Sequence, residues 1–152
     1  MKKIVVEVGS TCTKVDCYDG EKIEHIKTLP IEFKKNYKKE NKLDYNDVRK
    51  LIELVNSIES EDVYVCGTSI FRQLRENEKE EFLNLFKKET KKDFNIISQE
   101  DENIYTVKGA TKHVKEALVF VGGGGSTEIS YFNLEIKDMK NNKFGVMDIL
   151  NV

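Results

Sequence analysis

Apolar residues form one short run and then alternate with polar ones over residues 4–33, which is the pattern of β-strands with a buried face. A short apolar run ends at a glycine-containing turn, an alternating run follows, and Asp19-Gly20 then gives a strong hairpin signal. The pattern predicts three antiparallel strands, at residues 4–8, 13–18 and 22–33. Because Pro30 falls within the third run, we expect a sheet edge or a bulge there.

From residue 44 onward the apolar spacing changes to that of helices that alternate with short strands. Asp44 is placed to cap a helix in which apolar residues recur every three or four positions. Ser98 and Asp101 resemble a capping box at the start of a later helix. The pattern predicts helices over residues 44–59, 70–74, 78–92 and 98–108, and strands over residues 62–66 and 94–97.

A second set of strands follows residue 116 and repeats the order of the first set: an apolar strand, a glycine turn, a polar-faced strand, a turn and a third strand. We expect these strands at residues 117–121, 126–132 and 134–139. Strands first, followed by alternating helices and strands, predict an α/β fold. Its sheet would be mixed, with an antiparallel three-strand meander and helices on its faces.

Composition predicts a soluble globular protein of one domain or slightly more, since the 152 residues are 39% hydrophobic and 34% charged. No apolar run approaches the roughly 18 residues of a membrane span, and Glu7 comes too early for a signal peptide. We therefore expect a cytoplasmic protein with reduced cysteines and no membrane partner.

The net charge of −2, spread over both signs, argues against nucleic-acid binding. The lysine-rich run 34–42 either guides a polyanion or forms a solvated loop.

The clearest chemistry lies in the glycine turns of the two meanders. Four glycines at 122–125 cost much backbone entropy, which is tolerated where successive N–H groups form a concavity for phosphate or where a hairpin tip is mobile. Ser126 and Thr127 add hydroxyl donors to this turn. The first turn, residues 9–13, ends beside Lys14, which would face phosphate as a point charge. We expect the two turns to form the two sides of one phosphate site.

These two turns resemble the phosphate-binding loops of the actin-like, sugar kinase and heat-shock ATPase superfamily. Within it, three segments resemble the exopolyphosphatase/guanosine pentaphosphate phosphohydrolase family, in the order and at the spacing of that family. Residues 123–128 resemble its glycine-triplet-Ser-Thr-Glu loop, and residues 67–72 its Ala-Thr-Ser/Asn-x-x-Arg segment. Residues 97–102, with Gly109 downstream, resemble its Ile-Ser-Gly-x-Glu-Glu segment.

The resemblance implies a role for particular residues. Glu102 falls on the family's catalytic carboxylate and would deprotonate an attacking water, although acidic residues here also simply favour a helix N-terminus. Glu7 and Glu128 would hold magnesium, unless Glu128 merely lies on an exposed strand face. Arg72 would fork to phosphate oxygens, or else be a surface arginine. The implied phosphate-binding set is Gly9, Ser10, Thr11, Lys14, Arg72, Gly123, Gly124, Gly125, Ser126 and Thr127.

Several residues depart from the family pattern. Glu7 replaces Asp, and Thr11 with Cys12 stands where Asn and Ser are usual, which weakens the donors of the first turn. Gln99 replaces the glycine after Ile-Ser. Val121 replaces the Asp before the glycine triplet, and because valine cannot coordinate a cation, we expect weakened or altered magnesium dependence.

The resemblance implies a ribonuclease H-like, actin-like ATPase lobe over residues 1–112 and the start of an incomplete second lobe over 113–152. The family's cleft lies between two lobes, so this portion alone is expected to be inactive. It is also expected to expose apolar strands, which either favour self-association, for example as a homodimer, or are covered by a segment that packs back over them. Three functions follow. The first is hydrolysis of polyphosphate or guanosine pentaphosphate, which Glu102 and Arg72 favour. The second is an ATP-binding kinase or activator ATPase, and the third is a non-catalytic phosphate sensor, which Val121 favours.

Overall fold

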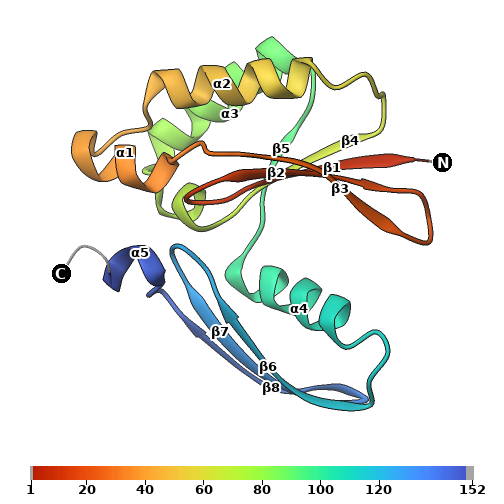
Figure 1. Ribbon diagram of the computed structural model, residues 1–152. Helices are drawn as coiled ribbons and strands as arrows, with labels where there is room; N and C mark the ends of the chain where they lie inside the picture. Colours follow the sequence, from red (N-terminus) through yellow and green to blue (C-terminus); the bar gives the residue numbers. More distant parts are fainter. Residues whose placement is uncertain (1, 150–152) are drawn as a thin grey trace. The chain divides into compact units, whose positions relative to one another are not determined.

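The computed structural model describes residues 2–149, apart from the side chains of Lys38, Glu40 and Met147. The chain divides into two compact units, Met1–Ile96 and Ile97–Val152. Each unit has its own sheet, with five strands in the first and three in the second (Figure 1). Helix and strand therefore combine into the predicted α/β architecture. The domain boundary placed between residues 112 and 113 stays a prediction.

A mixed sheet forms the centre of the first unit, in the strand order β3-β2-β1-β4-β5. The first three strands are antiparallel, as the alternating pattern predicts, whereas β4 and β5 run parallel to β1. Short strands with continuous apolar runs suit the buried parallel half of the sheet. The strands are β1 (Lys3–Val8), β2 (Thr13–Tyr18), β3 (Ile23–Leu29), β4 (Val63–Gly67) and β5 (Phe94–Ile96).

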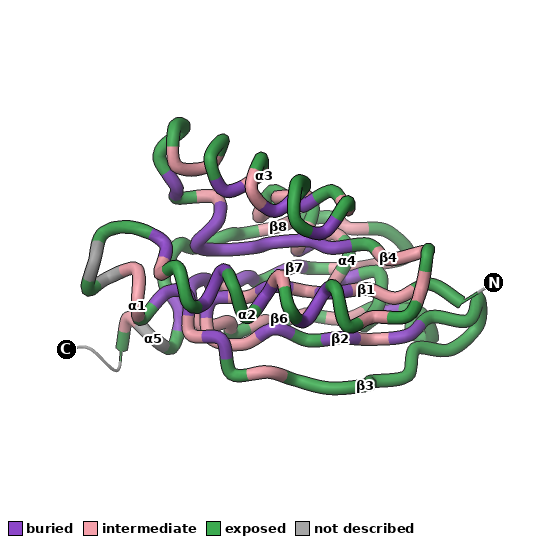
Figure 2. Tube along the Cα trace, turned by 90° about the horizontal axis from the view of Figure 1, so that it is seen from above, coloured by how far each residue is buried: buried purple, intermediate pink, exposed green. Residues whose placement is uncertain are grey.

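The third strand differs from its prediction. It ends at Leu29 and not at Phe33, and Pro30 follows it directly. The strand does lie at the sheet edge and is exposed along almost its whole length (Figure 2), so the expected edge is confirmed. The lysine-rich run after it forms the helix α1 (Phe33–Glu40), and the loop expected there is wrong. Phe33 is buried and anchors this helix in the core.

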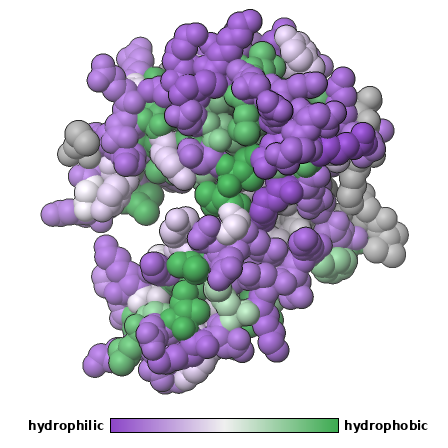
Figure 3. Space-filling model, turned by 180° about the vertical axis from the view of Figure 1, so that it is seen from behind, coloured by the Kyte–Doolittle hydropathy of each residue, from purple (hydrophilic) through white to green (hydrophobic). Residues whose placement is uncertain are grey.

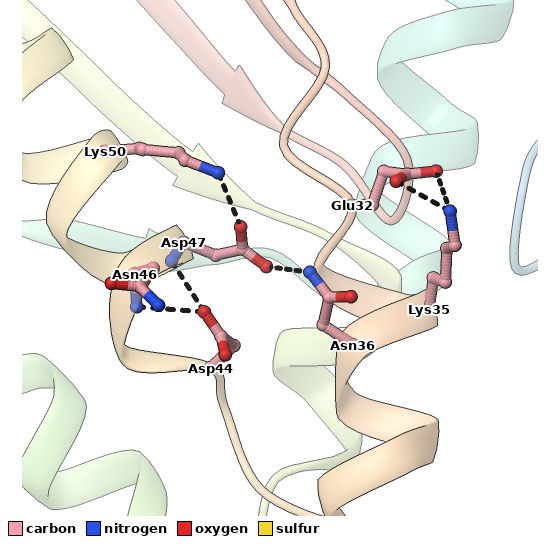
Figure 4. Close-up of polar contacts among 7 residues, drawn as sticks. All are labelled: Glu32, Lys35, Asn36, Asp44, Asn46, Asp47 and Lys50. Carbon is pink, nitrogen blue, oxygen red and sulfur yellow. Dashed lines mark hydrogen bonds and ion pairs between the residues drawn. The ribbon is translucent and has the colours of Figure 1, made fainter.

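Two longer helices, α2 (Tyr45–Asn56) and α3 (Glu76–Thr90), lie on one face of this sheet (Figure 1). Asp44 caps α2 as predicted, because its carboxylate accepts hydrogen bonds from the backbone N–H groups of Asn46 and Asp47. The buried Asp47 carboxylate accepts from the Asn36 amide at 2.6 Å and thereby joins α2 to α1 (Figure 4). The Asn36–Asp47 hydrogen bond holds α1 beside the beginning of α2.

Aromatic rings fill the core between these helices and the sheet. Phe71 packs against Phe33, Phe82 and Phe94, with ring centroids 4.8–5.3 Å apart. Phe71 belongs to the short 3₁₀ helix η1 (Ser69–Gln73), which confirms the helical stretch expected after Gly67. A Cβ at Gly67 would overlap the Phe94 ring, so this position requires glycine for close approach.

The second unit is an antiparallel sheet in the order β6-β7-β8, against which helix α4 packs. Ser98 caps α4 as predicted, since its hydroxyl accepts from the backbone N–H of Asp101. One sheet face remains exposed, and hydrophobic residues gather at the surface of this unit (green in the lower part of Figure 3). The elements are α4 (Gln99–Ala110), β6 (Glu116–Gly122), β7 (Thr127–Asn133), β8 (Glu135–Asn142) and α5 (Val146–Ile149).

Candidate functional site

The first glycine turn joins β1 to β2 and is closed by a backbone hydrogen bond from Gly9 N–H to the Cys12 carbonyl, at 2.9 Å. A Cβ at Gly9 would lie 3.1 Å from that carbonyl oxygen, which explains the preference for glycine at this tight closure. Ser10 is buried at the turn, and its carbonyl accepts from the backbone N–H of Lys34 at the start of α1. The turn is therefore held from both sides.

A second segment of the predicted site contacts this turn. Thr68 N–H donates to the Val8 carbonyl at 3.1 Å, and the Ser10 hydroxyl donates to the Ser69 hydroxyl at 2.7 Å. Ser69 has a φ of 47°, a left-handed conformation that is uncommon for serine and marks local strain. Half-buried Arg72 follows one turn later on η1. The structure thus brings the residues 9–14 and 67–72 together within the first unit.

Glu7 and Lys14 are directly opposite each other on β1 and β2. The Lys14 ammonium lies 3.9 Å from the Glu7 carboxylate, and their side chains are 48% and 41% exposed. An ion pair this exposed contributes little stability, so either partner can exchange it for a ligand at small cost. Among the described residues no group of three or more His, Cys, Asp or Glu side chains could hold a metal ion.

The second glycine turn joins β6 to β7, and Gly123 N–H donates to the Ser126 carbonyl at 2.9 Å. Residues 144–146 also cover this turn, a contact that the sequence patterns do not predict. Val146 N–H donates to the Gly123 carbonyl, and the Thr127 hydroxyl donates to the Phe144 carbonyl at 2.7 Å. A Cβ on Gly145 would lie 2.6 Å from backbone nitrogens of this turn. Backbone contacts from residues 144–146 therefore brace the turn.

Glu128 follows the second turn on β7 and is only 3% exposed. The reading of Glu128 as part of an exposed strand face is therefore wrong. Its carboxylate accepts a 2.8 Å hydrogen bond from the Gln99 amide, which also donates to the Asn142 carbonyl at 3.2 Å. Val121 lies directly opposite Glu128 in the β6–β7 register, on the same face of the sheet.

Glu102 lies half-buried on the first turn of α4, where its N–H donates to the Ser98 carbonyl. Asn103 beside it is buried, donates to the Asn141 side chain at 2.7 Å and accepts from the Ser130 hydroxyl at 2.9 Å. Sequence patterns gave no sign of this contact, since it joins polar residues of three elements. It fixes the rotation of the helix that carries Glu102.

Each unit thus holds one glycine turn and one further predicted segment. The first contains Gly9, Ser10, Thr11, Lys14, Arg72 and Glu7, and the second contains Glu102, Gly123, Gly124, Gly125, Ser126, Thr127 and Glu128. The single site shared by both turns, and the roles of these residues, stay predictions. In the part of the chain that the structure describes, no helix is long and apolar enough to cross a membrane.

Comparison with known proteins gave one family and several solved structures of similar fold. A model of the Ppx/GppA phosphatase family matches residues 36–152. The crystal structure of the Aquifex aeolicus member of that family is 20% identical, with a TM-score of 0.77, over 100% of this chain and 54% of that chain. An exopolyphosphatase from Cytophaga hutchinsonii is 18% identical, with a TM-score of 0.76, over 99% of this chain and 53% of that chain. No curated protein sequence matches.

A more distant likeness identifies the wider fold. MreB 5 of Spiroplasma citri, solved bound to AMPPNP, is 13% identical, with a TM-score of 0.50, over 95% of this chain and 53% of that chain. Together these structures show that the chain has the actin-like ATPase fold, with its mixed sheet and its three-stranded antiparallel sheet. The chain spans about half the length of these solved structures.

Proposed function

Because this chain belongs to the Ppx/GppA phosphatase family, we propose that it forms the amino-terminal portion of an exopolyphosphatase-type phosphoanhydride hydrolase. The proposed substrates are inorganic polyphosphate and guanosine pentaphosphate, from which the terminal phosphate is released. One observation carries the proposal: in each unit a hydrogen bond joins the glycine turn, or the strand that follows it, to a segment that holds a predicted reactive residue. Ser10 joins the first turn to the segment of Arg72, and Glu128 beside the second turn is joined to the helix of Glu102.

The proposed chemistry is in-line attack of water on the terminal phosphoryl group, which depends mainly on positioning and charge stabilisation. Glu102 would accept the proton of the attacking water. Arg72 would bind two oxygens of the transferred group through its planar guanidinium, and Lys14 would add a point charge. Backbone N–H groups of the glycine turns would hold the other phosphates. No step is assigned to a metal ion, because the residues around Glu128 do not fit one.

A non-catalytic phosphate or nucleotide sensor is the second candidate. The pairing of Glu128 with Gln99 and the apolar Val121 opposite it favour this function, since both remove a cation ligand that a hydrolase of this family would use. The sensor would keep the two glycine turns and bind phosphate without turning it over. A homodimer and a cytoplasmic location belong to the same set of proposals.

Phosphate release from polyphosphate, guanosine pentaphosphate and ATP tests the proposal, on the longest natural chain that contains this sequence. The hydrolase requires release from polyphosphate or guanosine pentaphosphate in preference to ATP. Binding of polyphosphate without release from any of the three supports the sensor, and preferred turnover of ATP contradicts both. We expect the 152-residue chain alone to release little, because it spans about half of its solved relatives and one part of a cleft cannot position phosphate from both sides.

A further inference from the structure

Glu128 is a buried carboxylate whose hydrogen-bond partner is a neutral amide. Only 3% of the residue is exposed, and Gln99 Nε2 donates to its Oε1 at 2.8 Å. The same nitrogen donates to the Asn142 carbonyl at 3.2 Å, so both of its N–H groups are used. One side chain at the start of α4 thereby joins β7 to β8.

The residues around this carboxylate are poor cation ligands as a set. Magnesium takes octahedral oxygen ligands and usually requires one or two carboxylates in addition to water and substrate. Across the strand pair Glu128 faces Val121, which offers no oxygen from its side chain. On its other side Glu128 faces Asn141 of β8, whose side-chain oxygen already accepts from the Asn103 amide at 2.7 Å. Asn103 in turn accepts from the Ser130 hydroxyl at 2.9 Å. The residues present therefore do not fit the magnesium ion that the family resemblance implies for Glu128.

We propose that the Gln99 amide occupies the place of a divalent cation at Glu128, so that the second glycine turn is held without metal. A hydrogen bond to an ionised carboxylate is stronger than one between neutral groups, and here it satisfies the buried Oε1. A cation that bound Glu128 through Oε1 would have to displace the Gln99 amide from that oxygen. Gln99 and Val121 thus act together. Gln99 occupies the carboxylate of Glu128, and Val121 stands where the family has the Asp that would be the second carboxylate.

This inference concerns metal binding alone, so its test does not depend on hydrolase activity. Magnesium is titrated into the 152-residue chain by calorimetry, while the side-chain amide resonances of Gln99 are followed by NMR. We expect no saturable binding at Glu128 up to about 10 mM magnesium, and no movement of the Gln99 resonances. Saturable shifts of those resonances that Glu128→Gln abolishes would overturn the proposal.

Two substitutions separate the contribution of each residue. Gln99→Gly combined with Val121→Asp should create a magnesium site at least about tenfold tighter than either change alone produces. Glu100→Gly, at the neighbouring exposed position of the same helix turn, controls for the effect of glycine on α4. If Val121→Asp alone binds magnesium as tightly as the double variant, Gln99 has no blocking role and the proposal is wrong. The wild-type titration decides the question even if the double variant fails to fold.

Discussion

The hydroxyl of Ser10, in the first glycine turn, donates a 2.7 Å hydrogen bond to the hydroxyl of Ser69, 59 residues later in the chain. Both side chains are buried. The contact joins the turn between β1 and β2 to the beginning of η1, the short helix on which Arg72 lies. A hydrogen bond therefore joins two of the predicted phosphate-binding segments in the absence of a ligand.

We expect Ser10→Ala to lower the free energy of unfolding by about 1–2 kcal/mol, because the buried Ser69 hydroxyl loses its donor. Ser69→Ala should cost a similar amount, and the double variant should cost less than the sum of the two. Chemical denaturation of all three variants measures this coupling. Strictly additive losses would show that the two hydroxyls do not interact in solution. Ser60→Ala serves as a control, since Ser60 lies in the loop between α2 and β4, outside both segments.

Glycine at position 67 is required by packing, whereas glycine at position 109 is not. A Cβ on Gly67 would overlap the rings of Phe94 and Phe71, but one on Gly109 meets nothing within 4 Å. We expect Gly67→Ala to destabilise the protein by about 1–3 kcal/mol through overpacking. Gly109→Ala should stabilise α4 by about 0.5–1 kcal/mol, because glycine is a poor helix former. Thermal unfolding of the two variants should give shifts of opposite sign.

Local signals in the sequence predicted most of the fold. Asp44 and Ser98 mark the starts of α2 and α4 because each cap depends only on residues within the next turn. The apolar alternation likewise predicts β1 and β2 at nearly the observed bounds. The lysine-rich helix α1 was missed, since its apolar face consists of Phe33 and Tyr37, one turn apart, and lysines surround both of them in the sequence.

The contacts that shape the candidate site depend on distant residues and could not be predicted in the same way. Gln99 and Glu128 are 29 residues apart, and nothing local to either one indicates that they hydrogen-bond. The need for glycine at position 145 likewise follows only from its contact with the second glycine turn, about 20 residues earlier in the chain. The family motif identified the two glycine turns in the sequence. It did not reveal that Gln99, which replaces the motif's glycine, hydrogen-bonds to Glu128 in the folded chain.

Glu102 should be essential for turnover and dispensable for binding. In the longest natural chain, Glu102→Gln removes the proton acceptor while it keeps the shape of the side chain, so we expect turnover to fall about 10²–10⁴-fold. Polyphosphate affinity should change little. Glu100→Gln, on the same helix turn but exposed, should leave turnover unchanged. Equal activity of Glu102→Gln and the wild type would exclude Glu102 as the general base.

The exposed face of β6 and β7 should cause the 152-residue chain to self-associate. Leu118 and Phe120 on β6 are 73% and 67% exposed, and their cross-strand partners Tyr131 and Ile129 are also exposed. A second copy of the chain would remove this apolar face from water. We expect a concentration-dependent dimer by sedimentation, which Phe120→Ser weakens at least about tenfold. Tyr105→Ser, at a 60% exposed position on α4, is the control, and a strict monomer contradicts the prediction.

Gly145 should determine the conformation of the second glycine turn from outside it. Its Cα approaches so closely that a Cβ would lie 2.5 Å from the Gly123 carbonyl oxygen and 2.6 Å from the nitrogens of Gly125 and Ser126. Backbone atoms cannot rotate away as a flexible side chain can, so Gly145→Ala must push the two segments apart. We expect a loss of about 1–3 kcal/mol in the free energy of unfolding and large NMR shifts of the Gly125 and Ser126 amides.

The matched control for this change is Phe144→Ala. It removes a side chain that is 53% exposed while it leaves the carbonyl that accepts from the Thr127 hydroxyl. Those amide resonances should then stay in place and stability should change by less than about 0.5 kcal/mol. If the Gly125 and Ser126 amides respond no more to Gly145→Ala than to Phe144→Ala, the backbone contact does not brace the turn. A response confined to Gly145→Ala means that the shape of this turn, which we propose binds phosphate, depends on the segment that covers it.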